Sequence, residues 1–323
     1  MVRELLRAWC MRPAVVDIRP KQHARRSAEI SPFHRVDDDA HLGQYIPLHY
    51  HGQMLANEQR MAPFHEAIDK LVPVGSYVVE LGGGTGVMSF LASRRARKVT
   101  MVERVPHVAA TARLLLARNG VADKVSVVEA DARAYVPDEP VDVVICEMLH
   151  TALLREKQIE VLGRFKAQHE ARFGRRVPRI IPEASLLGVQ LIYQPYEFHG
   201  YYAPVPFFFE PGTGAGSTIE MSPPALYSLI EYVDDLPETF PVDALLTVDK
   251  PGTVNALRFS TRNAVGVFVA AKRTADWYMP NMSLALPHPI PVNAGDRLRV
   301  RFQYDAGGSI ESLQSSLQAS VEA

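Results

Sequence analysis

A short apolar strand that runs directly into a glycine-rich turn constrains the fold of this chain more than any other stretch. It reads Tyr77-Val-Val-Glu-Leu-Gly-Gly-Gly-Thr-Gly86, in which apolar or aromatic side chains surround one carboxylate, Glu80. Glycines let the backbone turn sharply and approach a ligand closely, and a helix is expected to follow over 87–97. Strand, turn and helix together are typical of an open α/β sheet that binds a nucleotide-like cofactor at the carboxyl ends of its strands.

The spacing of the glycines narrows the choice of cofactor. A dinucleotide site has the pattern G-x-G-x-x-G, whose third glycine packs the helix against the strand while the helix start takes the pyrophosphate. Here the glycines are Gly82, Gly84 and Gly86, and Val87 stands where the third glycine of that pattern belongs. The spacing argues against a pyrophosphate and favours S-adenosylmethionine, which has none.

Acidic residues at or just after predicted strands support the same cofactor. The strands are expected over 98–103, 125–129 and 141–146, with a helix over 106–119, and this βαβ series predicts a parallel sheet. Glu103 follows the turn by about twenty residues, where a carboxylate commonly holds a ribose diol. Asp131 and Ala132 are candidates for the adenine edge, and Glu80 is a further cofactor candidate. For Glu80, Glu103 and Asp131 the alternative is a solvated strand end.

Length and composition exclude several classes of protein. The 323 residues leave room for two domains, and a net charge of −1 gives no overall attraction to nucleic acid or to a membrane surface. Two cysteines form no disulfide framework, which predicts a cytoplasmic protein. No apolar run approaches a membrane span, and no His, Cys and Asp cluster has metal-ligand spacing. The basic first thirty residues fit a targeting peptide, a local helix or an arm folded over the site.

Before the glycine turn, apolar residues recur at helical spacing over 53–71, namely Met54, Met61, Phe64, Ile68 and Leu71. The pattern predicts one helix that lies against the sheet. Arg60 falls on the other side of this helix. It either reaches a cofactor carboxylate in a two-pronged pairing or is a solvated charge.

Two glutamates, Glu147 and Glu156, lie nine residues apart in the loop after the strand 141–146. A guanidinium held 4 Å from a sulfonium is repelled by about 4 kcal/mol at an effective dielectric of about 20, so compensating anions are needed. Two carboxylates supply them, match the planar guanidinium, and bias charge away from the attacking nitrogen. The alternative is a strand-end acid and a helix-start acid. His150, between them, is either a proton acceptor or a hydrogen-bond partner.

Four motifs resemble those of the protein arginine methyltransferases and follow one another in the same order. Along the chain they are the helix Met54-Leu-Ala-Asn-Glu-Gln-Arg60, the cofactor turn that starts at Val78, the loop from Glu147 to Glu156, and the junction Ile181-Pro182-Glu-Ala. The resemblance implies that Met54 packs near the sulfonium and that Arg60 holds the cofactor carboxylate. It also implies an N-terminal arm or lid over 1–50, a Rossmann-like S-adenosylmethionine-binding domain over 51–182, and a β-barrel over 183–323 that contributes to a homodimer.

Several positions depart from the family pattern. Tyr45 matches one tyrosine of a pair whose partner position holds His41, and the threonine-histidine-tryptophan loop appears as Ala275-Asp276-Trp277. The aromatic and glycine residues inside the double-glutamate loop are replaced by Leu149, His150 and Thr151. Tyr45 and Trp277 are expected to shape the acceptor pocket, with Trp277 stacked on a guanidinium; a core tryptophan is the alternative. The changes leave the acceptor open between free arginine, another small molecule and a protein arginine.

The second half of the chain predicts a barrel or a sandwich of antiparallel strands. The expected strands are 184–193, 243–248, 255–261, 265–272 and 297–304, separated by Pro and Gly turns. Residues 194–238 are dense in aromatic residues and proline, including Tyr201 and Tyr202, and form either a dimerisation arm or a packed loop.

The activity expected from these features is methyl transfer from S-adenosylmethionine to a guanidino nitrogen of arginine, without a metal. A nucleic-acid methyltransferase is an alternative, which would need a basic, aromatic-studded surface. A cofactor-binding protein without catalytic activity is another. The position and number of the methyl groups are left open.

Overall fold

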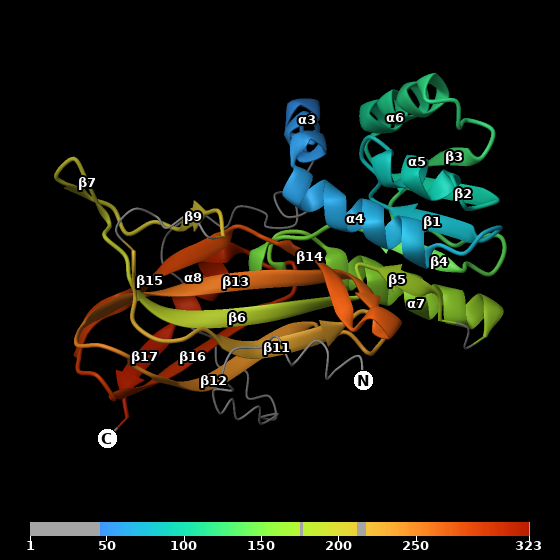
Figure 1. Cartoon of the computed structure of the whole chain (residues 1–323). Helices are drawn as coiled ribbons and strands as arrows, with labels where there is room; N and C mark the ends of the chain where they lie inside the picture. The colour runs from blue at the N-terminus through green and yellow to red at the C-terminus, as the bar shows by residue number, and fades with distance from the viewer. Residues whose placement is uncertain (1–45, 175–176, 212–217, 323) are drawn as a thin grey trace.

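A five-stranded parallel sheet with flanking helices forms the first part of the molecule (Figure 1). The computed structural model describes residues 46–174, 177–211 and 218–322. In spatial order the strands are β3 (Val125–Glu129), β2 (Lys98–Glu103), β1 (Tyr77–Leu81), β4 (Val143–Cys146) and β5 (Arg179–Ile181). Strand β1 is buried along its whole length, as its unbroken apolar run predicts. The strand order reverses beside β1 and β4, and ligands of open α/β sheets bind at such a point.

The helices of this part are α3 (Leu48–Ala56), α4 (Glu58–Leu71), α5 (Val87–Ser93), α6 (Pro106–Arg118) and α7 (Gln158–Phe173). Helix α3 projects away from the sheet, and none of its residues is buried (Figure 1). The single helix predicted over 53–71 is wrong. Asn57 interrupts it with φ −78° and ψ 95°, and its side chain accepts a hydrogen bond from Arg60 N as the N-cap of α4.

Helix α5 is also shorter than the predicted helix over 87–97. It ends at Ser93, and two backbone hydrogen bonds draw the following residues toward the start of β1. Gly75 N donates to Arg95 O at 2.8 Å, and Arg97 N donates to Ser76 O at 2.9 Å. The chain therefore leaves the helix in time to enter β2.

Antiparallel strands form the second part of the molecule. A seven-stranded sheet contains β6 (Ala184–Tyr193), β9 (Phe207–Phe209), β10 (Ile219–Glu220), β11 (Ala225–Glu231), β13 (Gly252–Phe268), β14 (Arg273–Tyr278) and β15 (Asn281–Val292). A three-stranded sheet contains β12 (Thr239–Thr247), β16 (Arg297–Asp305) and β17 (Gln318–Val321), beside helix α8 (Ile310–Ser316). The remaining hairpin is β7 (Glu197–Phe198) with β8 (Tyr201–Tyr202).

One expectation for the second part needs correction. Strands predicted over 255–261 and 265–272 are one long strand, β13, because β14 pairs with it across a bulge between Ala264 and Gly266; the short 3₁₀ helix η2 (Val269–Ala271) follows. The expected class is confirmed, since an antiparallel β domain follows the Rossmann-like sheet. Among the described strands, hydrogen-bonded pairing leaves the two larger antiparallel sheets separate. They share a core in which the ring centre of Phe302 lies 5.2 Å from that of Phe259 and 5.3 Å from that of Tyr227.

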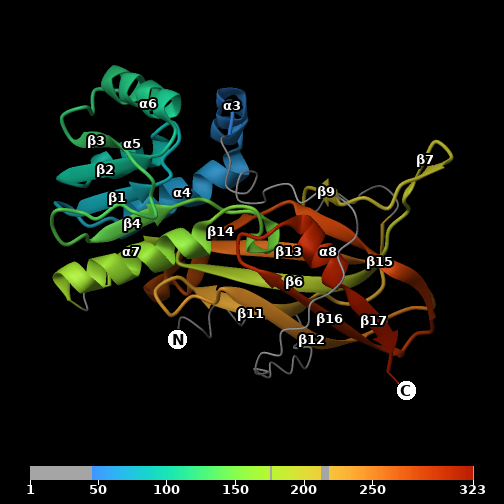
Figure 2. The ribbon, with the colours of Figure 1, turned by 180° about the vertical axis from the view of Figure 1, so that it is seen from behind.

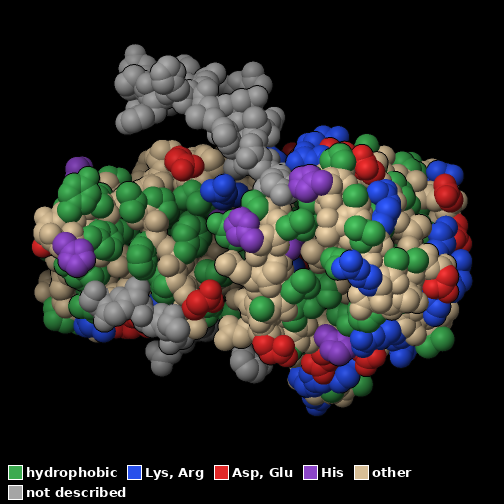
Figure 3. Space-filling model, turned by 90° about the horizontal axis from the view of Figure 1, so that it is seen from above, with side chains coloured by type: hydrophobic (Ala, Val, Ile, Leu, Met, Phe, Trp, Pro, Cys, Tyr) green, Lys and Arg blue, Asp and Glu red, His purple; other side chains and the backbone are tan. Residues whose placement is uncertain are grey.

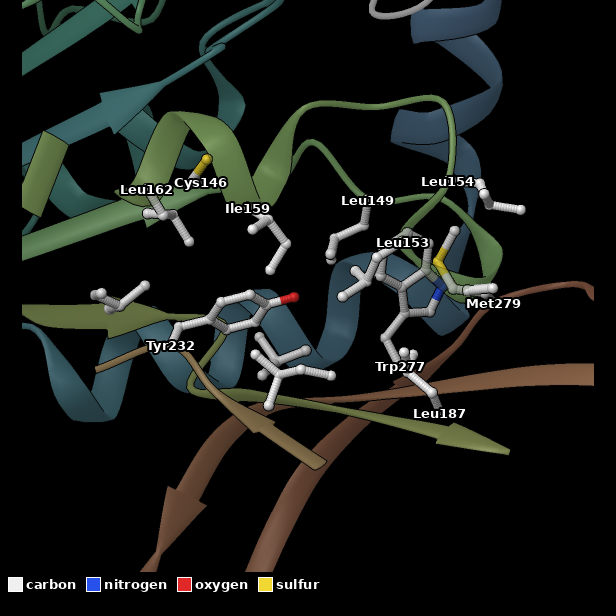
Figure 4. Packing of buried hydrophobic residues seen from close by; sticks show 14 of the residues in the cluster. Cys146, Leu149, Leu153, Leu154, Ile159, Leu162, Leu187, Tyr232, Trp277 and Met279 are labelled. Atoms are coloured by element: carbon white, nitrogen blue, oxygen red, sulfur yellow. The ribbon is translucent and has the colours of Figure 1, made fainter. Parts of the chain in front are cut away.

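The two parts are joined by a continuous apolar core. Helix α4 packs on β13 and β14, and α7 lies along the border between the parallel sheet and β11 (Figure 2). Figure 4 shows Cys146 and Leu149 from the first part facing Tyr232 and Trp277 from the second. No helix within the described ranges is both long and apolar enough to cross a membrane.

Candidate cofactor and acceptor site

A cavity of about 720 Å³ lies at the carboxyl ends of the central parallel strands. Its volume is within the range of about 300–1,000 Å³ that is usual for sites of small molecules and cofactors. The cavity is lined by every sequence-predicted site residue in the described ranges except Trp277; these are Met54, Arg60, Glu80, Gly82, Gly84, Glu103, Asp131, Ala132, Glu147, His150 and Glu156. Tyr45 lies outside the described residues.

The glycine turn forms one wall of the cavity. Gly84 has φ +56°, and a Cβ atom there would lie 2.7 Å from the His51 ring. Gly82 has φ +74°, and its Cβ would lie 3.0 Å from the Met148 side chain. Only glycine adopts this backbone without strain, and in this structure the His51 ring and the Met148 side chain pack where a Cβ atom would lie.

Two carboxylates support the turn from β1 and β2. Glu103 accepts hydrogen bonds from Gly84 N at 3.0 Å and Val105 N at 2.9 Å, and it keeps further lone pairs for a ligand. Glu80 accepts from both the backbone and the hydroxyl of Ser89 on α5. Burial raises the pKa of Glu80 to about 7, although the bonds from Ser89 oppose the rise. Neither carboxylate is a solvated strand end.

Arg60 is paired with a glutamate of the double-glutamate loop. Its Nε donates to Glu147 Oε2 at 3.1 Å, and one terminal nitrogen donates to the same oxygen. The other terminal nitrogen lies 3.4 Å from Met54 O. Arg60 is only 8% exposed, which excludes the solvated charge considered from the sequence. In this structure, Glu147 holds a guanidinium that belongs to the protein itself.

The adenine-side candidates lie after β3. Asp131 forms an ion pair with Arg133 at 2.7 Å, and this pairing lowers the pKa of the Asp131 carboxyl. Asp131 lines the cavity but stays partly exposed, so its contact with the cofactor stays a prediction. Ala132 is buried against the core and leaves space at the cavity wall.

Glu156 completes the acidic end of the cavity. Burial raises the pKa of Glu156 to about 8, and the Glu147 carboxylate adds to the rise. Burial also raises the pKa of Glu147, while the Arg60 guanidinium opposes that shift. A cation bound between the Glu147 and Glu156 carboxylates, or a proton on one of them, relieves the repulsion between their charges.

The backbone between the two glutamates is strained. Within and after the short 3₁₀ helix η1 (Thr151–Leu153), Ala152, Leu153 and Arg155 have φ values of 60°, 55° and 61°. Residues with side chains rarely adopt such angles unless their surroundings impose them. The second part of the molecule imposes them here, since Ala152 N donates to Thr261 Oγ1 at 2.7 Å and Arg155 N donates to Gly308 O at 2.8 Å.

The two remaining candidates for the acceptor site, His150 and Trp277, lie at different distances from the cavity. His150 lines the cavity, contacts the edge of Phe208, and has a pKa lowered by burial. Trp277 is buried, packs edge-on against Phe64, and carries the Arg60 guanidinium 5.7 Å from its ring centre. In this structure Trp277 stands behind Arg60 instead of lining the cavity, and its stacking on an acceptor stays a prediction. Asp276, next to Trp277 in the sequence, forms an ion pair with Arg262, with 2.8 Å between the carboxylate oxygen and a guanidinium nitrogen.

Sequence comparison supports the assignment of the fold. A family model described as a methyltransferase domain matches residues 78–167. An uncharacterized protein of Methanothermobacter thermautotrophicus is 31% identical over 268 residues, which cover 83% of this chain and 97% of that protein. Human protein arginine N-methyltransferase 2 is 31% identical over 157 residues, which cover 47% of this chain and 36% of the human protein.

A solved structure agrees along most of the chain. The PRMT1 enzyme-prozyme heterotetrameric complex of Trypanosoma brucei with AdoHcy superposes with a TM-score of 0.64 at 18% identity. The match covers 84% of this chain and 96% of the trypanosomal chain. This chain is a protein arginine methyltransferase-like class I methyltransferase.

The cavity fits the S-adenosylmethionine that class I methyltransferases use. The methyltransferase has a glycine turn at Gly82 and Gly84, a buried carboxylate at Glu103, and a buried cation at Arg60, and all of these residues line the cavity. Within the described residues, His, Cys, Asp and Glu do not gather in groups of three or more that would hold a metal ion.

Several lining or supporting residues of the methyltransferase were not predicted from the sequence. Gln158, at the start of α7, donates to Cys146 O at 2.8 Å and accepts from Met148 N at 2.9 Å, so it fixes the backbone on both sides of Glu147. Arg155 and Lys157 line the cavity beside Glu156. The sequence held only a weak signal for this pair, namely two cations that flank a predicted site residue.

Proposed function

We propose that the methyltransferase transfers a methyl group from S-adenosylmethionine to a guanidino nitrogen of arginine. The observation that carries the proposal is the pairing of Arg60 with Glu147 next to the cofactor cavity. A carboxylate that accepts two N–H groups of one guanidinium has the position and charge that an arginine acceptor needs. Glu156 lines the same cavity and supplies a second anion.

The proposed chemistry depends mainly on position and charge. S-adenosylmethionine supplies an electrophilic methyl group on a sulfonium. Glu147 and Glu156 hold different edges of the acceptor guanidinium, draw its positive charge toward themselves, and leave electron density on the attacking nitrogen. A proton leaves the methylated nitrogen, and the Glu156 carboxylate, which lines the same cavity, is placed to accept it.

We assign the two parts of the chain different tasks. Residues 51–182 bind the cofactor and include the double-glutamate loop. Residues 183–323 fix the conformation of that loop and help to form the acceptor site. The hydrogen bonds from Ala152 to Thr261 and from Arg155 to Gly308 support this division, since they run from the loop to the second part. We further propose a homodimer, supported by the exposed aromatic residues Tyr201 and Tyr202.

The test is the mass of the product formed from labelled S-adenosylmethionine with free L-arginine, an arginine-rich peptide and their lysine counterparts. We expect an arginine product, and we expect Glu147→Gln and Glu156→Gln each to lower kcat/KM at least about 100-fold, because each removes an anion that acts on the reacting guanidinium. Cofactor affinity, measured by calorimetry with S-adenosylhomocysteine, should fall much less in Glu156→Gln.

The matched control is Glu139→Gln. Glu139 pairs with Arg97 and Lys98 and does not line the cavity, so this variant should keep the wild-type rate. If the wild type binds S-adenosylhomocysteine but methylates neither form of arginine, the acceptor is not a guanidino group and the proposal fails.

A further inference from the structure

Two cations stand beside the acidic end of the cavity without a role in the chemistry above. Arg155 and Lys157 flank Glu156 in the sequence, and both line the cavity. Lys157 Nζ lies 3.4 Å from Gly307 O, so Lys157 is located on the side of the second part. A guanidinium acceptor is itself a cation, and two further cations next to its site repel it unless the acceptor also carries a negative group.

The position of Arg155 is imposed by the fold. Its φ of 61° is unfavourable for arginine, and the hydrogen bond from Arg155 N to Gly308 O holds the residue there. A second bond, from Gly307 N to Leu153 O at 2.8 Å, fixes the neighbouring turn. Strained residues that are fixed from several sides occur mostly at ligand sites. Arg155 is exposed and lines the cavity, so a ligand bound there can reach its guanidinium.

The charge of Arg155 acts on the acidic end directly. Burial is the main cause of the raised pKa of Glu156 and of the lowered pKa of His150. The positive charge of Arg155 lowers the pKa of both groups. Arg155, Glu156 and His150 all line the same cavity, so the Arg155 charge can act on a molecule bound there.

The chemistry of the acceptor decides what such a cation recognises. In free arginine the carboxylate is six bonds from the guanidinium carbon, a span of roughly 7 Å when extended. A peptidyl arginine places a neutral peptide group at this distance. Arginine pairs strongly with carboxylates through two parallel hydrogen bonds, whereas a neutral peptide leaves its charge uncompensated.

We propose that Arg155, assisted by Lys157, binds the α-carboxylate of the acceptor, so that the substrate is a free guanidino acid of the size of L-arginine and not a peptidyl arginine. The proposal rests on the guanidino methyl transfer proposed above and adds the substrate class. Glu147 and Glu156 hold one end of the amino acid, and Arg155 and Lys157 hold the other.

The experiment compares acceptors that differ in the carboxylate. They are L-arginine, L-argininamide, agmatine and an arginine peptide with blocked ends. Binding is measured by calorimetry with S-adenosylhomocysteine present, and methylation is measured by product mass. We expect wild-type protein to bind L-arginine roughly 10- to 150-fold more tightly than L-argininamide, the factor that corresponds to one charge-assisted hydrogen-bonded contact.

The variants assign this difference to named residues. Arg155→Gln should weaken L-arginine binding by the same roughly 10- to 150-fold and leave L-argininamide binding unchanged or tighter. Lys157→Gln should act in the same direction with a smaller effect. Arg164→Gln is the control, because Arg164 is exposed on α7, pairs with Glu160 and does not line the cavity. It should change neither affinity.

The outcomes separate the two proposals. Methylation of L-argininamide, agmatine or the peptide as efficiently as L-arginine would overturn the carboxylate site and leave guanidino methyl transfer in place. An L-arginine preference that survives in both Arg155→Gln and Lys157→Gln would do the same. Failure to methylate any of the four acceptors would overturn both. If Arg155→Gln does not fold, the wild-type comparison of L-arginine with L-argininamide still decides the question.

Discussion

Glu156 is the residue whose ionisation matters most for acceptor binding. Its pKa is raised to about 8, first by burial and then by the Glu147 carboxylate. At neutral pH the empty site therefore holds a proton on Glu156 for much of the time. A guanidinium needs the charged carboxylate, and its arrival displaces that proton.

We expect the affinity for L-arginine, measured with S-adenosylhomocysteine present, to fall about fivefold as the pH drops from 8 to 7 and about tenfold more as it drops from 7 to 6. The sign follows from the raised pKa, since the charged form of Glu156 is lost as the pH falls through it. Calorimetry in buffers of different ionisation enthalpy should count close to one released proton at pH 7. Constant affinity between pH 6 and 8, or a pH dependence that persists in Glu156→Gln, would contradict this assignment.

Several acidic residues of the cavity were predictable because they lie at or just after the end of a parallel strand, and parallel strands end at one edge of a sheet. Glu103 and Glu147 were found in this way. Their partners were not, because the pairing of Arg60 with Glu147 depends on how α4 packs against the loop. The position of Trp277 behind Arg60 depends on packing between distant elements in the same way.

The double-glutamate loop receives its shape from the second part of the molecule. Three positive φ angles lie between Ala152 and Arg155, and Thr261 on β13 holds the first of these residues by its hydroxyl. Thr261 is 2% exposed, so water does not replace this bond when the hydroxyl is removed. Strand β13 thus fixes the backbone of the double-glutamate loop.

We expect Thr261→Val to lower the free energy of unfolding by about 1–3 kcal/mol, because it leaves the buried Ala152 N–H without a partner. It should also lower kcat/KM more than it weakens cofactor binding, since it disturbs the glutamates and not the glycine turn. Thr261→Ser keeps the hydroxyl and should restore most of the rate. Chemical unfolding and steady-state kinetics make the comparison. Equal loss in both variants would show that the methyl group of Thr261, and not the hydrogen bond, is important.

Element boundaries were predictable where a periodic pattern met a clear stop. Strand β6 has the bounds expected from the sequence, and β1, β2 and β3 agree as well. The break at Asn57 was missed because apolar spacing continues across it, and only the cap formed with Arg60 N shows that two helices meet there. The continuity of β13 was missed because a bulge looks like a turn in the sequence.

Apolar side chains gather unevenly on the face of the molecule that Figure 3 draws. Figure 3 shows hydrophobic residues concentrated over the antiparallel part, while Lys and Arg gather on the parallel part. The β7–β8 hairpin extends from the body of the molecule (Figure 1), and Tyr201 and Tyr202 on it are 72% and 63% exposed. Contiguous exposed aromatic residues of this kind mark association surfaces in many proteins.

We expect the protein to be a dimer at micromolar concentration and the double variant Tyr201→Ser, Tyr202→Ser to be largely monomeric, because the variant removes the most exposed aromatic area. Sedimentation equilibrium measures both masses. Tyr50→Ser is the control, since Tyr50 is an exposed aromatic residue on α3 and not on the hairpin. A monomeric wild type, or a double variant that remains dimeric, would show that the hairpin is not the interface.

Under the function proposed above, the pair formed by Arg60 and Glu147 would couple the two ligands to one another. A cofactor carboxylate that attracted the Arg60 guanidinium would leave Glu147 open for the acceptor. Thermodynamic linkage makes such coupling reciprocal: whatever factor the cofactor adds to the affinity of the acceptor, the acceptor returns to the cofactor. When cofactor is scarce, Arg60 would keep Glu147 occupied, and the protein would not sequester arginine that it has no means to methylate.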